Sequence, residues 1–425
     1  MVMKFSASAT EPLFASTRNA QQSNGFTLVE ILVVLAILGI MGAMVTTAIS
    51  GVTTTAREAR TKSVIAVCDS VVQELYESTK YRPLAVEVPT LSTSFNAPSG
   101  NNVTVSQEVL ATEAARVRLI MVRDLQKMEL PDHHEDYVGA TTANVQSRIW
   151  AAANPVFFNT STGQVVGSRD ALASRNTLAV NWSLTPKAST YLQRYNSAAT
   201  TASAAALLTN QGAECLYAIM SNSFVAGSPA IASIPTTNIG DTDEDGLPEI
   251  LDGWGQPLGF IRWPVGFFDP ESDLTTELPD DFDPFRADFA YVNNSNTANA
   301  TDVNDDIDPT KKPWSIRPLI FSAGNDGQFG IAQVPHVSGT PVTNFSYSHD
   351  DWNLQPSTAI ADDFMGDESE GRANSVNSYD YPDPYLRRFL TLNPGAILPG
   401  QVLPGTNNQE AAIDNITNYS LQGSQ

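Results

Sequence analysis

The chain has 425 residues, and its 46 acidic residues against 24 Lys and Arg give it a formal net charge of −22. Such a chain is poorly suited to binding nucleic acid, because affinity for the phosphate backbone comes from Lys and Arg. The excess of carboxylates favours solubility in bulk water and the binding of cations, and the length allows a sizeable core with more than one lobe.

One stretch near the N-terminus is long and apolar enough to cross a membrane. Residues 31–49 carry no charged side chain over 19 residues, which suffices for about one bilayer crossing. Lys4 and Arg18 precede the stretch, which predicts a cytoplasmic N-terminus with the rest of the chain outside. We therefore expect a single-pass protein of the inner (cytoplasmic) membrane, with its head in the periplasm or at the cell surface.

One carboxylate, Glu30, stands directly before this apolar stretch. A carboxylate loses its water in hydrocarbon, so an isolated acid at this position indicates a function and requires a cationic partner. The surrounding residues read Gly25-Phe26-Thr27-Leu28-Val29-Glu30. An ordinary secretory signal fits poorly, because it prefers a small-residue cleavage site after its apolar region.

This segment and the apolar run after it resemble the N-terminal signal of the type IV pilin and type II secretion pseudopilin superfamily. The resemblance implies that prepilin peptidase cuts after Gly25 and methylates the new N-terminus at Phe26, so that residues 1–25 are a leader peptide. It also implies that Glu30 pairs with the free amine of Phe26, in its own or a neighbouring subunit. The implied partners are the peptidase, like subunits and minor pseudopilins in a helical filament, the assembly platform with its ATPase, and the membrane.

Residues 26–80 are expected to form one long stalk helix. Its second half becomes amphipathic, with Val64, Val67 and Val71 at three- and four-residue spacing. Glycines and threonines have poor helix propensity, and their concentration predicts a weak point around residues 46–55.

Residues 81–235 are expected to form a mainly helical insertion in the head. The segment begins with a stretch rich in Pro, Ser, Thr and Asn, which predicts a linker or an extended, strand-like excursion. Helical patterns follow at residues 105–129, 141–154 and 187–222.

Two groups of chemically versatile side chains are interpreted as structural. His133 and His134, followed by Glu135 and Asp136, indicate a solvated helix terminus, because adjacent side chains on a helix point apart. Cys68 and Cys215 fall in helical, apolar stretches and are expected to be buried thiols, with a disulfide as the alternative.

Residues 236–331 are expected to form a small antiparallel sheet, from short apolar runs at 257–263, 289–292 and 318–321 bounded by turn residues. Residues 332–425 are expected to be a loop-rich tail. The predicted fold class is α+β: a long N-terminal helix, transmembrane and then amphipathic, packed on a head with additional helices and a small antiparallel β-sheet with long loops.

Residues 241–252 match the twelve-position calcium loop, with Gly at position 6 and acids at positions 1, 3, 5, 9 and 12. These acids are Asp241, Asp243, Asp245, Glu249 and Asp252. Hard Ca²⁺ takes six to eight oxygen ligands, and the glycine permits the sharp turn. Position 12 is Asp rather than the longer Glu, and flanking helices are missing, so we expect an isolated structural Ca²⁺ loop; a solvated acidic turn is the alternative.

Two glycine-rich segments, D-G-W-G-Q-P at 252–257 and F-S-A-G-N-D-G-Q-F-G at 321–330, form a pair. They resemble segments in the head of the major pseudopilin of type II secretion, in which a loop after the second segment binds structural Ca²⁺. The resemblance implies a second site that involves Asp326 and acids further along the chain. Either Asp350 with Asp351 or Asp414 could supply them, and the sequence leaves that choice open.

The sequence contains no nucleophile elbow, phosphate loop, dinucleotide fingerprint or zinc-ligand spacing. We therefore expect a non-enzymatic structural subunit of a type II secretion pseudopilus. The alternatives are a major or minor type IV pilus subunit for adhesion or DNA uptake, and a surface binding protein or enzyme anchored by a pilin-type signal.

Overall fold

The structure is a computed structural model that describes residues 27–83, 93–96, 102–105, 107–138, 157–159, 164–167, 185–225, 227–267, 280–285, 314–342, 345, 347–353, 378–386, 389–390 and 393–422. The chain divides into two compact units, Met1–Thr54 and Thr55–Gln425, each with its own internal contacts. The leader and the expected helix at 141–154 lie outside the described residues, as does the expected strand at 289–292.

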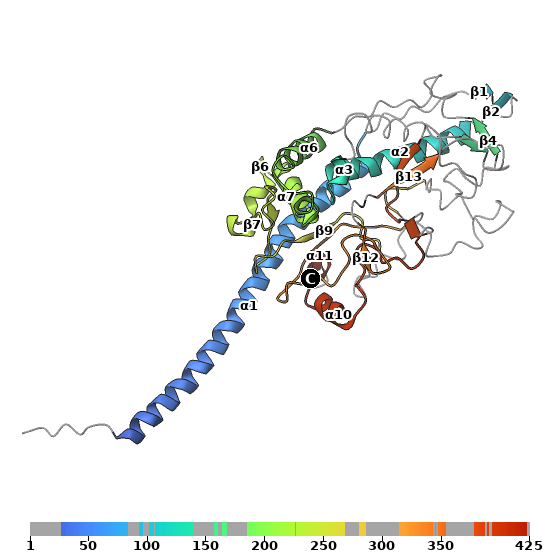
Figure 1. Ribbon diagram of the computed structural model, residues 1–425. Helices are drawn as coiled ribbons and strands as arrows, with labels where there is room; N and C mark the ends of the chain where they lie inside the picture. Colours follow the sequence, from blue (N-terminus) through green and yellow to red (C-terminus); the bar gives the residue numbers. More distant parts are fainter. Residues whose placement is uncertain are drawn as a thin grey trace, which may run out of the picture. The chain divides into compact units, whose positions relative to one another are not determined.

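Helix α1 covers Leu28–Lys80 (Figure 1). It runs without a break through residues 46–55, where low propensity predicts a weak point, and the Thr46 hydroxyl donates to the carbonyl of Gly42 at 2.7 Å. The helix ends shortly before Pro83, whose ring disfavours helical geometry in the residue before it.

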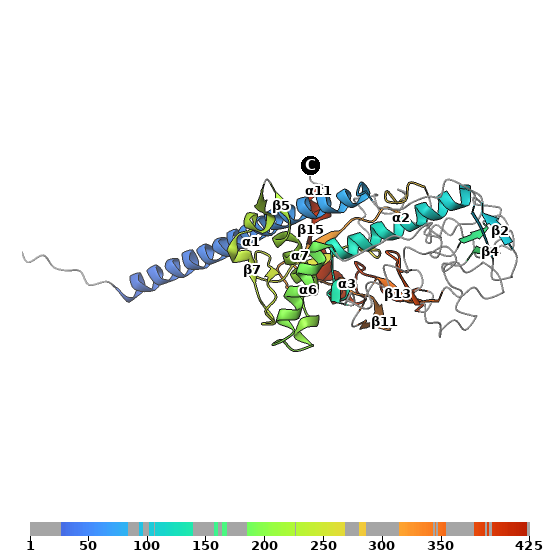
Figure 2. The same ribbon diagram turned by 90° about the horizontal axis from the view of Figure 1, so that it is seen from above.

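The other helices fall mainly between residues 107 and 221, as expected. They are α2 (Gln107–Glu129), α3 (Glu135–Val138), α6 (Pro186–Ala198) and α7 (Gln211–Ser221), with short 3-10 turns at Ala206–Leu208, Ala230–Ser233 and Thr236–Asn238. The tail adds α10 (Thr406–Ile413) and α11 (Asn418–Gln422). Figure 2 shows α6 and α7 beside α3 at the end of α2, and the cluster of Tyr137, Tyr191 and Cys215 joins these elements.

The strands are short and pair antiparallel. Two-stranded pairs are β1 (Thr93–Asn96) with β2 (Asn102–Val105), β3 (Phe157–Asn159) with β4 (Gln164–Gly167), β5 (Phe224–Val225) with β6 (Ser228–Pro229), β7 (Ile239–Gly240) with β8 (Glu249–Ile250), β11 (His336–Val337) with β12 (Thr340–Pro341), and β13 (Ser348–Asn353) with β14 (Ser378–Pro382).

One three-stranded sheet has the order β15-β10-β9, from Ile416–Thr417, Leu319–Ser322 and Gly259–Ile261. Phe321 faces Gly259 across β10 and β9, and a Cβ on Gly259 would lie 2.2 Å from the Phe321 ring, so only glycine fits under that ring. The third strand comes from the segment expected to be a loop-rich tail.

The main core joins the second half of α1 to the rest of the head. Val64, Cys68 and Val72 of α1 belong to the same buried cluster as Leu216 of α7 and Phe260 of β9. The predicted amphipathic face of α1 is therefore its packing face. Cys68 and Cys215 are both buried, and neither forms a disulfide. The prediction of buried thiols is therefore confirmed, and the alternative of a disulfide bond is not.

Candidate functional site

The first turn of α1 holds Glu30 in a capping box. The Thr27 hydroxyl accepts from the backbone N–H of Glu30 at 3.2 Å. In return, Oε2 of Glu30 accepts from the backbone N–H of Thr27 at 2.8 Å and from its hydroxyl at 2.9 Å. This reciprocal bonding defines the helix start and gives the carboxylate a partner within its own chain. Gly25 and Phe26, the predicted processing site, lie outside the described residues.

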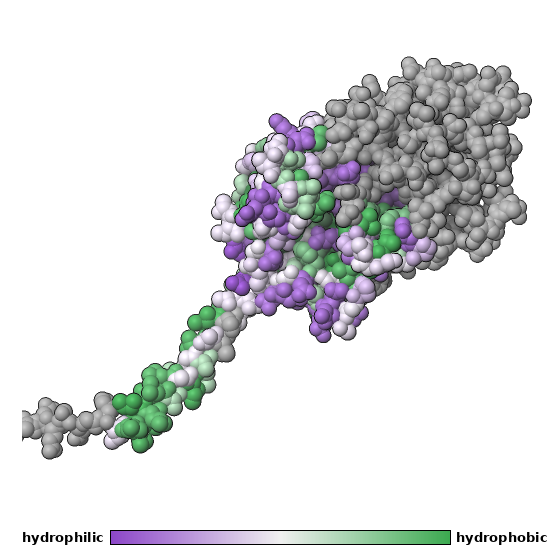
Figure 3. Space-filling model, viewed as in Figure 1, coloured by the Kyte–Doolittle hydropathy of each residue, from purple (hydrophilic) through white to green (hydrophobic). Residues whose placement is uncertain are grey.

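The first part of α1 is an apolar surface. Every side chain described between residues 28 and 46 is exposed, including Leu28 at 81 % and Met44 at 66 %. Figure 3 shows this part of the helix as mainly hydrophobic. By length and composition α1 could cross a membrane, and an apolar surface of this extent requires lipid or neighbouring helices.

The acidic loop at 241–249 folds around Asp241. Its Oδ1 accepts from the backbone N–H of Asp245 at 3.1 Å and its Oδ2 from that of Gly246 at 3.0 Å. Gly246 has φ +92°, a left-handed conformation that favours glycine. The turn expected at position 6 of the loop is therefore present.

The same loop is clamped to the start of helix α7. Glu249, in β8, accepts from the backbone N–H and the hydroxyl of Thr242, both at 2.8 Å. It also accepts at 3.2 Å from the Nδ2 of Asn210, which stands at the N-cap position of α7 and donates more weakly to Asp243 at 3.4 Å. Glu249 thus positions the loop through hydrogen bonds.

Glu214, in the first turn of α7, is the residue that the sequence motif missed. One carboxylate oxygen each from Glu214, Asp243 and Asp245 lie within 4.8 Å of one another. Glu214 is outside the twelve-residue motif, and its only signal in the sequence is that it is the single acid in the apolar run at residues 210–220. The structure therefore adds a helical carboxylate to the loop.

The electrostatics of this group are unfavourable when no cation is present. Burial first, and then the charges of neighbouring Asp245 and Asp243, raise the pKa of Glu214 to about 10. Burial likewise raises the pKa of Asp243, Asp245 and Glu249. Each carboxylate disfavours ionisation of the others.

His134 orients Glu214. Burial lowers the pKa of His134 to about 3, so the ring is neutral at pH 7. Its Nε2 lies 2.6 Å from Oε2 of Glu214, and its Nδ1 bonds the hydroxyl of Tyr137. When Glu214 is ionised, the tautomer with its proton on Nε2 satisfies both contacts, with Nε2–H donating to the carboxylate and Nδ1 accepting from the tyrosine.

Asp252, the twelfth position of the predicted loop, belongs to a different cluster. Its Oδ1 accepts from the backbone N–H groups of Trp254 and Gln256 at 2.8 and 2.9 Å. Its Oδ2 accepts from the Ser322 hydroxyl at 2.7 Å. Asp252 therefore joins the 252–257 turn to the 321–330 turn, and the structure does not bring it to the other four acids.

The two glycine-rich turns and the end of the chain meet at one place. Trp254 Nε1 donates to Oδ1 of Asn325 at 3.2 Å, and the backbone N–H of Asn325 donates to Oδ2 of Asp414 at 3.1 Å. Gly324 has φ +68° and lies against Asp414, where a Cβ would come within 2.6 Å of its carbonyl oxygen. The structure thus brings Asp414 to the second turn.

Asp326, another acid predicted for this second site, is hydrogen-bonded within its own turn. The exposed carboxylate of Asp326 accepts from the backbone N–H of Gln328 at 2.8 Å. Asp350 and Asp351 lie in β13, which pairs with β14. Among the side chains that the structure describes, no group of three or more potential ligands includes Asp326 or Asp414. The side chains of Asp350 and Asp351 lie outside the described ones.

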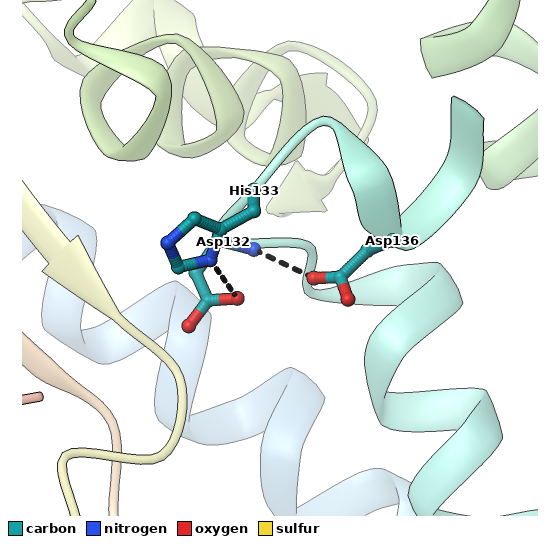
Figure 4. Close-up of side chains that lie close together, drawn as sticks. All are labelled: Asp132, His133 and Asp136. Carbon is teal, nitrogen blue, oxygen red and sulfur yellow. Dashed lines mark hydrogen bonds and ion pairs between the residues drawn. The ribbon is translucent and has the colours of Figure 1, made fainter. Parts of the chain in front are cut away.

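The expectation of a solvated terminus at residues 133–136 was wrong. His133, His134 and Asp136 are buried, with exposures of 6 %, 4 % and 0 %. Figure 4 shows Asp132, His133 and Asp136 close together, with the His133 ring 3.0 Å from the Asp132 carboxylate. The segment is buried because a residue distant in the sequence supplies a positive charge that neutralises its two aspartates.

That residue is Arg262, which follows β9. Its Nη1 lies 2.6 Å from Oδ2 of Asp136 and its Nη2 lies 3.2 Å from Oδ1 of Asp132. The side chains of all three residues are at most 1 % exposed. Lys127 adds a contact to Asp136 at 3.9 Å. The Asp132, His133 and Asp136 group therefore has its counter-ions from the protein itself, and it is an ion-pair network rather than a metal site.

The comparisons with known proteins bear on the N-terminus. Residues 21–46 match the protein family described as the prokaryotic N-terminal methylation motif. A search of curated proteins and a search of solved structures each found no match for the chain. The chain thus carries a type IV pilin-like signal for prepilin peptidase, joined directly to an apolar helix that suggests membrane anchoring.

Proposed function

We propose that this protein is a structural subunit of a type II secretion pseudopilus. The observation that carries the proposal is the methylation motif continuous with an exposed apolar helix. Processing by prepilin peptidase prepares a chain of this kind for assembly, and the exposed helix supplies a surface for lipid before assembly and for neighbouring helices afterwards.

The proposed mechanism needs no catalytic group of its own. The peptidase cuts after Gly25 and methylates Phe26, and the platform and ATPase move the chain out of the membrane. During that transfer Glu30 exchanges its bonds to Thr27 for the amine of Phe26 in a neighbouring subunit. An ion pair at that point offsets the penalty of burying the carboxylate among apolar helices.

Contact between the two glycine-rich turns supports the secretion branch of the superfamily. These turns carry the D-x-W-G-x-P and F-S-x-G-x-D-G patterns, and the Asp252–Ser322 and Trp254–Asn325 bonds join them. Segments that resemble one region of a family's head should be neighbours if the resemblance reflects a shared local fold, and here they are neighbours.

Replacing Glu30 tests the assembly step. We expect Glu30→Ala to be cleaved after Gly25 but to enter filaments at least about tenfold less, because it lacks the carboxylate that pairs with the neighbouring amine. Mass spectrometry of the mature N-terminus and immunoblots of sheared filaments measure the two steps. Glu74→Ala, an exposed acid on the same helix, is the control. Equal incorporation of Glu30→Ala and Glu74→Ala would refute the proposed role.

A type IV pilus subunit is the second candidate, and the large size of the head segment at residues 81–235 favours it. That segment contributes α2, α6 and α7, whereas the major pseudopilin that the turns resemble has a shorter head. Deletion of the gene separates the two. Retention of secreted proteins in the periplasm with intact surface pili supports the pseudopilus, and loss of surface pili with normal secretion supports the pilus.

A further inference from the structure

We propose that Glu214 of α7, together with Asp243 and Asp245 of the loop, forms a Ca²⁺ site that fastens the acidic loop to the core helix α7. The site differs from the twelve-position motif, because a glutamate from another element takes the place of the terminal ligand. It is also separate from the 321–330 turn and Asp414.

Orphaned oxygen atoms in the group point to a ligand. Oε1 of Glu214, Oδ1 of Asp243 and Oδ2 of Asp245 are buried and have no hydrogen-bond partner in the described part of the chain. The other oxygen of each carboxylate is occupied, by His134, Asn210 and the backbone N–H of Leu247 respectively. Glu214 and Asp245 are 3 % and 2 % exposed, so these free oxygens have little access to water.

Within the described part of the chain, neither lysine nor arginine neutralises the group. Across the described ranges, no Lys or Arg forms an ion pair with Glu214 or with the acids of residues 241–249. The contrast with the Asp132–Asp136 network is informative, because there Arg262 and Lys127 are in place. A buried carboxylate group without a protein counter-ion is strongly unfavourable, and a bound cation removes that penalty.

The donor set selects a hard cation. All the free ligand atoms are carboxylate oxygens, and the nearest imidazole, His134, uses both ring nitrogens for Glu214 and Tyr137. One carboxylate oxygen from each of Glu214, Asp243 and Asp245 lies within 4.8 Å of the other two. That spacing fits one Ca²⁺, since ligands at 2.3–2.6 Å on opposite sides lie about 4.6–5.2 Å apart. Water completes the coordination shell.

The position of Glu214 explains the short acid at position 12 of the motif. Asp252 is engaged with Trp254, Gln256 and Ser322, so the terminal ligand comes from α7. The helix that carries Glu214 also contributes Leu216, Ile219 and Met220 to the main core. Binding of the ion would therefore connect the loop to the main core of the head.

Calcium titration of the full-length chain in detergent, after removal of metal by chelator, tests the site. We expect saturable binding by calorimetry and a rise in the thermal midpoint with CaCl₂, and a weaker response to MgCl₂, which dehydrates reluctantly. A wild-type chain that shows no saturable calcium binding would overturn the proposal.

Two isosteric variants identify the ligands. Glu214→Gln keeps an acceptor for His134 but removes a charge, and we expect it to bind Ca²⁺ at least about tenfold more weakly. Asp252→Asn is the control and should bind within about twofold of the wild type, because its carboxylate serves the Trp254 turn. Loss of affinity in Asp252→Asn with normal affinity in Glu214→Gln would assign the site to the linear motif and contradict the proposal.

Stability supplies an independent readout that separates ligand loss from misfolding. In chelator, Glu214→Gln should have a thermal midpoint equal to or above that of the wild type, because it removes repulsion. In CaCl₂ the order should reverse, because only the wild type gains the full stabilisation from the ion. An equal gain from calcium in both chains would exclude Glu214 as a ligand.

Discussion

Arg262 shows how single residues determine which acids of this head are structural. Burial would raise the pKa of Asp132, but Arg262, with a further contribution from His133, outweighs that effect and leaves the pKa well below its usual range. Its guanidinium also donates to the carbonyl of Leu130 at 2.9 Å and lies 4.2 Å from the centre of the Trp263 ring. One arginine thus compensates two buried carboxylates and a backbone carbonyl.

Replacing Arg262 should therefore be strongly destabilising. Arg262→Met keeps much of the side-chain volume but leaves Asp132 and Asp136 buried without their main counter-ion, and we expect a loss of about 3–5 kcal/mol in the free energy of unfolding. Chemical denaturation monitored by circular dichroism measures it. Arg57→Met, at an exposed position of α1, should change stability by less than about 0.5 kcal/mol. Similar stabilities for the two variants would contradict the assignment.

At the scale of single residues, the sequence indicated which acids form a cluster but not which distant residues they contact. The alternating acids of residues 241–245 and Gly246 could be recognised because their geometry is local to one turn. Glu214 and Arg262 could not, because they lie far along the chain from the acids that they meet. Consecutive polar residues such as His133 and His134 look solvated until the cation that neutralises their neighbours is known.

Among the elements, the second half of α1 and the turn at 252–257 fit each other closely. Gly253 donates from its backbone N–H to the Thr61 hydroxyl at 2.8 Å. A Cβ at Gly253 would lie 2.3 Å from the carbonyl oxygen of Arg57. The glycine is needed here because the turn packs directly on the helix backbone, which cannot move aside.

Gly253→Ala should loosen this packing. We expect a loss of about 1–3 kcal/mol, the usual effect of overpacking, visible as a lower thermal midpoint. Gly51→Ala, where a Cβ meets nothing within 4 Å, should instead be neutral or stabilise by up to about 1 kcal/mol, because alanine favours the helix. A neutral Gly253→Ala would mean that the turn can move away from α1 without penalty.

Elements with local signals were predicted well and those with distant partners were not. Periodicity, with a Pro-rich stretch after residue 80, places α1 and α2 close to their observed bounds. Strand β15 has only two residues and pairs with β10, about a hundred positions earlier, so no local pattern reveals it. The side chain of Asn418 then fixes the strand by accepting from Ile320 at 3.0 Å and donating to Asp69 at 2.7 Å.

For the molecule as a whole, the division at Thr54 and Thr55 separates two physical environments. The first unit exposes an apolar helix and holds the processing motif. In the second, the described core begins at Val64 and continues through Tyr76 on α1 before it reaches the head. The long helix therefore has an assembly part and a folding part.

Two truncations should distinguish these parts. A chain that begins at Thr55 keeps every residue of the described core clusters, so we expect it to be soluble without detergent and to unfold cooperatively near the full-length midpoint. A chain that begins at Arg82 loses Val64, Ile65, Cys68, Val71, Val72 and Tyr76, each at most 5 % exposed. Removal of one large buried side chain typically destabilises by about 2–5 kcal/mol, and six such losses exceed the about 5–15 kcal/mol that holds a domain together. Near-ultraviolet circular dichroism and calorimetry compare the two, and a folded chain from Arg82 would show that α1 contributes nothing essential to the head.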